Sequence, residues 1–71
     1  MQLSPVLCIF TLYEETEDES LVLDRFTTMD AAIMYAADLY NVPSDAWERD
    51  EEGNIWITED GDYVIEPAFV L

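Results

Sequence analysis

Residues 55–66 read IWITEDGDYVIE, and this stretch decides the fold. Two short runs rich in β-branched and aromatic residues flank the dipeptide Asp60-Gly61. Asp-Gly between two such runs is a strong signal for a two-residue β-hairpin turn of type I′, which needs positive φ at both central positions. The sequence therefore predicts a hairpin centred on this dipeptide.

A two-residue turn also fixes the register of the predicted hairpin. The expected cross-strand pairs are Glu59–Asp62, Thr58–Tyr63, Ile57–Val64, Trp56–Ile65 and Ile55–Glu66. Side chains alternate between the two faces of a strand, so each face collects a different set. The face predicted to join the core carries Trp56, Thr58, Tyr63 and Ile65. The other face, an acidic surface with an apolar centre, carries Ile55, Ile57, Val64, Glu59, Asp62 and Glu66.

Further strands are expected on the N-terminal side of this hairpin. Residues 47–50 form a short predicted strand, and residues 51–54 form a turn. The stretch at residues 6–13 is β-branched and aromatic with no polar alternation, which predicts a central strand covered on both faces. An acidic loop at residues 14–20 follows, and residues 21–24 return as a second strand.

Residues 28–40 are predicted to form the one helix of the chain. Thr27 and Asp30 have the spacing of a capping box, with Asp in place of Glu, and Asn41 and Pro43 end the helix. At 3.6 residues per turn one stripe is expected to face the core. This stripe consists of Met29, Ile33, Ala36, Ala37 and Tyr40.

The predicted fold class is therefore α+β. An antiparallel sheet of four to five strands carries one packed helix, in the order strand, strand, helix, strand, strand, strand. Residues 1–71 form a single domain, because a chain of this length supports only one core.

Charge is the second strong signal. Seventeen Asp and Glu residues stand against two Arg, with no His and no Lys, so the formal net charge is −15. The chain is nevertheless 51% hydrophobic and 13% aromatic, which favours a folded domain over disorder. Direct binding to nucleic acid or to an anionic membrane is excluded as a function, because both surfaces repel such a chain.

Localisation is expected to be cytoplasmic. No basic residue precedes the apolar start, and no apolar run reaches the ~20 residues of a membrane span. The single Cys8 cannot form an internal disulfide, and in its apolar surroundings it is interpreted as an inert core thiol.

Enzymatic activity is not expected. Without His or Lys the chain lacks the commonest general base, the Schiff-base amine and the phosphate-loop lysine. Residues 50–54 begin like a calcium loop but place Gly53 two positions too early, so no metal site is predicted, and no cofactor either.

Most of the acid falls in three clusters, which are the predicted partner-binding residues. They are Glu14, Glu15, Glu17, Asp18 and Glu19, then Asp50, Glu51 and Glu52, then Glu59, Asp60, Asp62 and Glu66. Glu59 opposite Asp62 would be a like-charge cross-strand pair, which costs ~0.2 to 1 kcal/mol and serves no folding purpose. Rigid hairpins that carry such acid display spaced negative charge as a phosphate backbone does, and a basic groove would accept it.

The outer side of the helix is unusually free of charge. Met34, Tyr35 and Leu39 lie there. A loop or a chain end covers these side chains, or else they form an apolar contact surface for a homodimer or a partner. The many Asp and Glu residues of the chain also have an alternative explanation. They would form the solvated surface of a halophilic protein, and would then not imitate nucleic acid.

In size, acidity and layout of helix and hairpins, the chain resembles the small acidic DNA-mimic inhibitors of host defence that phages and mobile elements encode, of the anti-CRISPR and anti-restriction type. Its residues 14–19, 50–52 and 59–62 carry the resemblance, without a shared motif. The resemblance implies a phage inhibitor whose partner is a Cas protein of a CRISPR effector complex, held at the basic site for target DNA or its PAM. An immunity or antitoxin protein that neutralises a basic nuclease toxin would use the same physics.

Overall fold

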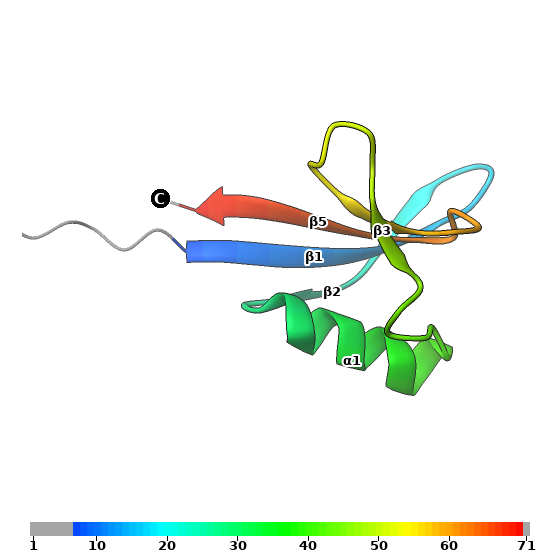
Figure 1. Ribbon diagram of the computed structural model, residues 1–71, viewed down its shortest axis with the longest axis horizontal. Helices are drawn as coiled ribbons and strands as arrows, with labels where there is room; N and C mark the ends of the chain where they lie inside the picture. Colours follow the sequence, from blue (N-terminus) through cyan, green and yellow to red (C-terminus); the bar gives the residue numbers. More distant parts are fainter. Residues whose placement is uncertain (1–6, 71) are drawn as a thin grey trace, which may run out of the picture.

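The computed structural model describes residues 7–70 and confirms the predicted α+β fold. One helix accompanies a five-stranded antiparallel sheet, in the predicted order along the chain (Figure 1). The elements are β1 (Leu7–Glu15), β2 (Ser20–Phe26), α1 (Met29–Tyr40), β3 (Trp47–Arg49), β4 (Trp56–Thr58) and β5 (Tyr63–Val70).

The strands lie in the sheet in the order β2-β1-β5-β4-β3. β1 is an interior strand, as expected, and it pairs with β5 from Leu7 opposite Val70 to Glu14 opposite Tyr63. This long pairing joins the N-terminal and C-terminal hairpins into one sheet. The start of the predicted first strand, Val6, lies outside the described residues.

The first hairpin is longer than predicted, because its loop is tighter. Thr16 closes the loop: its backbone N–H donates to the carbonyl of Glu19 at 2.9 Å, and its hydroxyl donates to the same carbonyl at 3.0 Å. The backbone N–H of Glu19 donates in turn to the Thr16 hydroxyl oxygen at 3.1 Å. The prediction that Glu14 and Glu15 belong to an acidic loop is therefore wrong, because both are residues of β1.

The helix occupies the predicted segment, but its N-terminal cap is shifted by one residue. Thr28 is the N-cap, and its hydroxyl accepts a hydrogen bond from the Ala31 N–H at 3.1 Å. The predicted capping box from Thr27 to Asp30 is thus wrong, although Asp30 in the first turn still complements the helix dipole. Asn41 ends the helix in the left-handed conformation, with φ 57°.

The core lies between α1 and the sheet. Its buried members are Leu12, Ala32, Ala36, Val42, Trp47 and Ile65. Ala32 is fully buried although the predicted stripe omitted it, whereas Ala37 of that stripe is only half-buried. Tyr35, predicted on the outer side, packs against the core. Cys8 is half-buried.

The second hairpin has the predicted register but a different turn. Trp56 pairs with Ile65 and Ile57 with Val64, as expected. Of the two central residues of this turn, Asp60 and Gly61, only Gly61 has a positive φ. The turn is therefore not of type I′, which needs positive φ at both positions. The residues between the two strands, 59–62, form a four-residue loop, and Glu59 and Asp62 are not the predicted cross-strand pair.

Side chains explain this turn. The Gly61 N–H donates to the Thr58 carbonyl at 2.9 Å, which closes a tight turn over Glu59 and Asp60. The Thr58 hydroxyl donates to the Asp60 carboxylate at 2.8 Å and accepts from the Tyr63 N–H at 3.2 Å. The hydroxyl thus takes the place of a backbone acceptor at the end of the ladder, which the dipeptide signal could not reveal.

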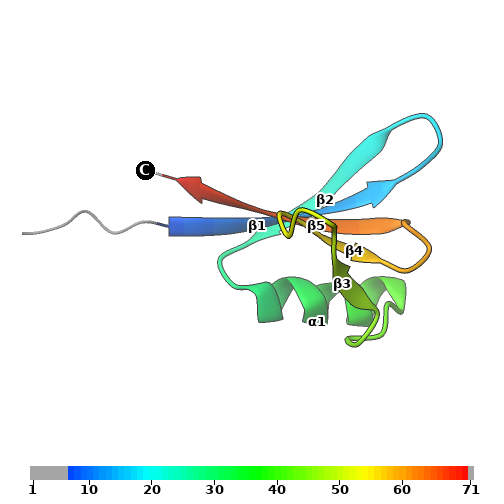
Figure 2. The ribbon, with the colours of Figure 1, turned by 45° about the horizontal axis from the view of Figure 1, so that its top comes forward.

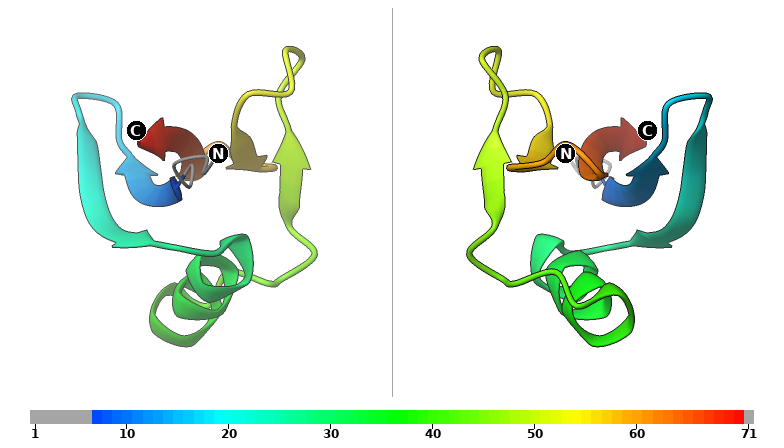
Figure 3. Two further views of the ribbon diagram at one scale, coloured as in Figure 1. Left: turned by 90° about the vertical axis from the view of Figure 1, so that its left-hand side faces the viewer. Right: turned by 90° about the vertical axis from the view of Figure 1, so that its right-hand side faces the viewer.

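The helix lies along one face of the sheet only. Figure 2 shows α1 on one side of the strands, while the hairpin of β1 and β2 projects toward the other side. The end-on views of Figure 3 show that the loop between β3 and β4 projects to that side as well. No second helix lies on that other face within residues 7–70, yet Thr11 of β1 is buried there and Tyr13 is half-buried, because side chains of neighbouring strands cover them.

Candidate functional site

The face of the sheet turned away from α1, called the open face below, has an apolar row across its middle. The strand register places Val22, Tyr13, Val64, Ile57 and Glu48 side by side, one from each strand in sheet order. The first four members of this row are apolar or aromatic. An antiparallel sheet with one solvated face normally puts polar residues there, so this row departs from the usual pattern.

A shallow hollow of about 340 Å³ lies over this row. Its lining is apolar in the middle and carries a carboxylate on each side, and consists of Tyr13, Glu15, Ser20, Ile55, Ile57, Val64 and Glu66. The predicted acidic surface with an apolar centre therefore exists for Ile55, Ile57, Val64 and Glu66. The sequence missed the contribution of β1 and β2, because it depends on the sheet order.

Two acidic tips project on the same side of the sheet as the open face (Figure 3). The first tip is the β1–β2 loop, residues 16–19, where the side chains of Glu17, Asp18 and Glu19 are exposed. The second tip is the β3–β4 loop, residues 50–55, with Glu51 and Glu52 exposed. The exposed acidic residues of two of the three predicted clusters therefore flank the open face.

Some of the predicted binding residues also hold the tips in shape. Asp50 is half-buried, and its carboxylate accepts hydrogen bonds from the backbone N–H groups of Asn54 at 2.8 Å and Ile55 at 3.4 Å. Glu52 accepts from the Asn54 side-chain amide at 3.1 Å. Glu15 accepts from the Ser20 hydroxyl across the first hairpin. These bonds pre-organise the tips before any partner arrives.

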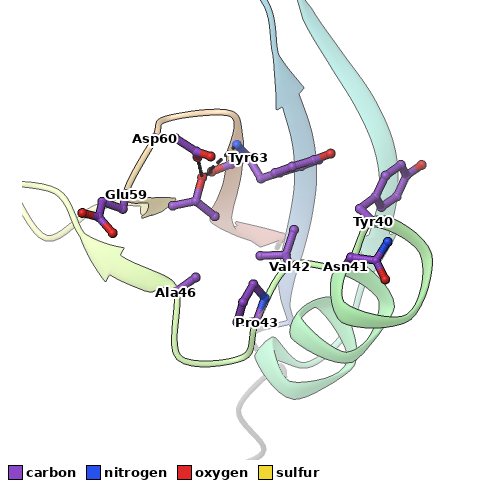
Figure 4. A pocket seen from close by; sticks show the side chains of 9 residues that line it. Tyr40, Asn41, Val42, Pro43, Ala46, Glu59, Asp60 and Tyr63 are labelled. Atoms are coloured by element: carbon purple, nitrogen blue, oxygen red, sulfur yellow. Dashed lines mark hydrogen bonds between the residues drawn. The ribbon is translucent and has the colours of Figure 1, made fainter.

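The third cluster is divided. Glu66 belongs to the open face, and the Asp62 carbonyl accepts the Glu15 N–H at 2.7 Å. Glu59 and Asp60 instead line a hollow of about 530 Å³ at the C-terminal end of α1 (Figure 4). The Thr58 hydroxyl, followed by the Asp62 N–H, holds the pKa of Asp60 below its ordinary value.

Glu14 lies on the helix side of β1 and not with the other acids of its cluster. Its carboxylate accepts a hydrogen bond from the Tyr63 hydroxyl at 3.4 Å. Burial, followed by the nearby Glu14 charge, raises the pKa of Tyr63. Both observations give Glu14 a structural role beside Tyr63.

Aromatic rings connect the helix to both hairpins. Phe26 contacts Tyr35 with ring centroids 5.1 Å apart, Tyr35 contacts Tyr40 at 6.1 Å, and Tyr40 contacts Tyr63 at 5.6 Å. Burial raises the pKa of Tyr35, with further contributions from Tyr40 and Asp24. This packing leaves Met34 and Leu39, 63% and 58% exposed, as the uncovered apolar residues of the predicted outer helix side.

A third hollow, of about 540 Å³, lies at the opposite end of the sheet from the helix C-terminus. Phe10, Trp56, Pro67 and Phe69 contribute its apolar walls, and the Arg49 guanidinium lies 5.0 Å from the centre of the Trp56 ring. Phe69 is 76% exposed. The sequence does not indicate this group, because the pairing of β5 with β1 and β4 is what brings Phe10, Trp56 and Phe69 to one hollow.

In residues 7–70 no three carboxylate or thiol side chains converge in a way that would hold a metal ion. The one helix of that part of the chain is not of the length and apolarity that a membrane span requires. Comparison with protein-family models, with curated proteins and with solved structures finds no match for this chain. The site must therefore be interpreted from its own geometry.

Proposed function

We propose that this protein acts by binding and not by catalysis: it occupies a basic, nucleic-acid-binding site of another protein. In the most specific form of this proposal it is an anti-CRISPR DNA mimic that blocks target-DNA or PAM binding by a Cas surveillance complex in the cytoplasm of the host cell. The observation that carries the proposal is the position of the acid. Two pre-organised acidic tips flank one sheet face, and Glu15 and Glu66 lie on that face.

Electrostatics support this function. A net charge of −15 steers a basic partner toward the chain, and the affinity of such a contact falls as salt screens the charges. Hydrogen bonds hold the backbone of both tips in place, so their exposed carboxylates present negative charge in two defined regions, as a nucleic-acid backbone presents it to a basic groove. Both tips are closed by hydrogen bonds within their loops, so little order has to be gained on binding.

A second candidate function rests on the apolar centre of the open face. An immunity or antitoxin protein that blocks one nuclease toxin would combine charge attraction with an apolar contact specific to that toxin. The Tyr13, Val64 and Ile57 row provides such a contact.

The experiment that tests these proposals is a capture assay with competition. The tagged protein is incubated with lysates of CRISPR-bearing hosts and of toxin-bearing hosts, and the retained proteins are identified. Retention of a Cas complex that duplex DNA displaces supports the mimic, and retention of a single nuclease toxin supports the immunity function. Retention of no basic nucleic-acid-binding protein from either lysate would contradict both.

Matched charge variants assign the surface. Asp18→Asn with Glu51→Gln neutralises one exposed carboxylate on each tip, whereas Asp38→Asn with Asp45→Asn neutralises two exposed carboxylates away from the tips. The two variants have the same net charge, so only position differs. We expect the tip variant to weaken binding of the captured partner by about tenfold and to flatten its salt dependence, with little effect of the control variant. Equal weakening by both would show that total charge acts without a defined face.

A further inference from the structure

The apolar centre of the open face is separate from the core between α1 and the sheet. The segments Ile55–Ile57 and Tyr63–Ile65 are apolar on both faces of their strands, although α1 covers only one of those faces. Val64 is 6% exposed and Ile57 and Tyr13 are half-buried, so their side chains cover one another and leave the hollow above them. In the same row Val22 is 46% exposed.

Acid surrounds this apolar row on several sides. Glu15 and Glu66 line the hollow itself, Glu48 ends the row on the edge strand β3, and the two tips project beside it. A phosphate backbone offers charge without any such apolar centre. The face therefore presents two kinds of surface at once, apolar in the middle and negative around it.

These features restrict the occupant. A second copy of this chain would bring another charge of −15 against the same carboxylates, which disfavours self-association through this face. An acidic or neutral apolar segment would leave the surrounding carboxylates without partners. A basic segment with an apolar stripe matches both surfaces, because its apolar side chains reach the row while its Lys or Arg side chains reach the carboxylates.

We infer that the open face is a docking site for a basic amphipathic segment, such as a helix, of the partner protein. The apolar stripe of that segment packs on Tyr13, Ile57 and Val64, and its flanking positive charges pair with Glu15, Glu66 and the tips. The inference rests on the proposed function and deepens it: charge attracts the partner, and the apolar row determines which basic segment remains bound.

Two synthetic peptides of equal length and equal positive charge test the inference. One consists of Lys and Leu in the pattern of an amphipathic helix, and in the other every Leu is replaced by Ser. We expect the folded protein to bind the Lys/Leu peptide at least about tenfold more tightly, as measured by fluorescence anisotropy, because only that peptide buries apolar surface. Equal affinity for the two peptides would overturn the inference and leave the charge-based function standing, whereas binding of neither at low salt would overturn both.

Variants place the contact on the open face. Tyr13→Thr with Ile57→Thr keeps strand propensity and charge while removing apolar area from the row. Met34→Gln with Leu39→Gln removes exposed apolar area from the helix on the other side of the sheet. We expect the first variant to lose most of the preference for Lys/Leu and the second to keep it. If the Thr variant is folded, as judged by circular dichroism, and still prefers the Lys/Leu peptide, the inference is overturned. If that variant does not fold, the affinities of the wild-type protein for the two peptides decide the question.

Discussion

At the scale of single residues, Thr58 organises the hairpin that decides the fold. Its side chain is buried. Its hydroxyl donates to the Asp60 carboxylate and, at 3.4 Å, to the Tyr63 carbonyl, and it accepts a hydrogen bond from the Tyr63 N–H. One hydroxyl thereby joins the loop to the end of the strand ladder. Its neighbours in the loop, Asp60 and Gly61, supply the carboxylate and the positive φ that the loop needs.

Replacing Thr58 by Val tests this role. The two side chains have nearly the same shape, but Val leaves the Tyr63 N–H without its acceptor, and an unsatisfied buried donor costs about 1 to 3 kcal/mol. We expect that loss in the free energy of unfolding measured with urea. Thr27→Val, at an exposed position before the helix, is the control, and equal losses in both variants would refute the role.

Asp60 gives the same loop a dependence on pH. Its pKa is lowered in the folded protein, so its contribution to stability is present above the ordinary Asp value of 3.8 and is lost as pH falls through the folded value. The free energy of unfolding of the Asp60→Asn variant is therefore expected to fall less between about pH 6 and about pH 3 than that of the wild type, because Asn does not titrate. Urea unfolding at the two pH values measures it, and an unchanged difference would show that other carboxylates carry the acid dependence.

At the scale of elements, the aromatic series holds α1 on the sheet. Phe26 comes from β2, Tyr35 and Tyr40 from α1, and Tyr63 from β5, and consecutive rings lie within packing distance. The series contacts both hairpins, so it couples the helix to elements that are distant in sequence.

The raised pKa values of Tyr35 and Tyr63 predict a loss of stability in alkaline solution. Both hydroxyls stay protonated to higher pH in the folded protein than in the unfolded chain. Their stabilising contribution is therefore complete below about pH 10 and is lost as pH rises through the folded values. The chain has no Lys that titrates in the same range.

Urea unfolding at about pH 8 and about pH 11 measures this loss. The double variant Tyr35→Phe with Tyr63→Phe cannot ionise at these positions, so its stability should change less between the two pH values. The same change in the variant and in the wild type would mean that these hydroxyls do not determine alkaline stability.

Elements differ in how far local sequence determines them. The Asp60-Gly61 signal and the β-branched and aromatic runs beside it were sufficient for the register of β4 and β5, because both depend on neighbouring residues. The type of the turn was not predictable, because a side chain of the preceding strand reshaped it. The core stripe of α1 was correct at Met29, Ile33, Ala36 and Tyr40, but it included Ala37 in place of Ala32. These two residues are equally apolar, and only packing distinguishes them.

At the scale of the whole molecule, the candidate site depends on the order of the strands. The acidic clusters were evident in the sequence, but nothing local indicates that β1 pairs with β5, which brings Tyr13 beside Val64. That long-range pairing creates the apolar row, whereas the loop shaped by Thr58 places Glu59 and Asp60 at a different hollow. The sequence therefore predicted the acidic clusters and the part of the open face formed by β4 and β5. It did not predict that β1 and β2 complete this face.

The net charge makes a prediction about stability. Repulsion among carboxylates destabilises the compact state, and raising ionic strength from about 0.01 M to about 0.15 M shortens the screening length from about 30 Å to about 8 Å. We expect the protein to be folded at the lower salt and its Tm to rise by about 4 to 8 °C, on the order of 1 kcal/mol. A chain that stays unfolded at both concentrations and folds only in molar salt would favour the halophilic alternative.

We propose above all that the open face and its two tips form one binding surface for a basic partner. Amide chemical shifts of the isotope-labelled protein, recorded by NMR as the Lys/Leu peptide is added, test that claim residue by residue. We expect the largest changes at Tyr13, Ile57 and the tips at residues 16–19 and 50–55, and little change at Met34 and Leu39. Changes centred on α1, or spread evenly over every acidic segment, would contradict it.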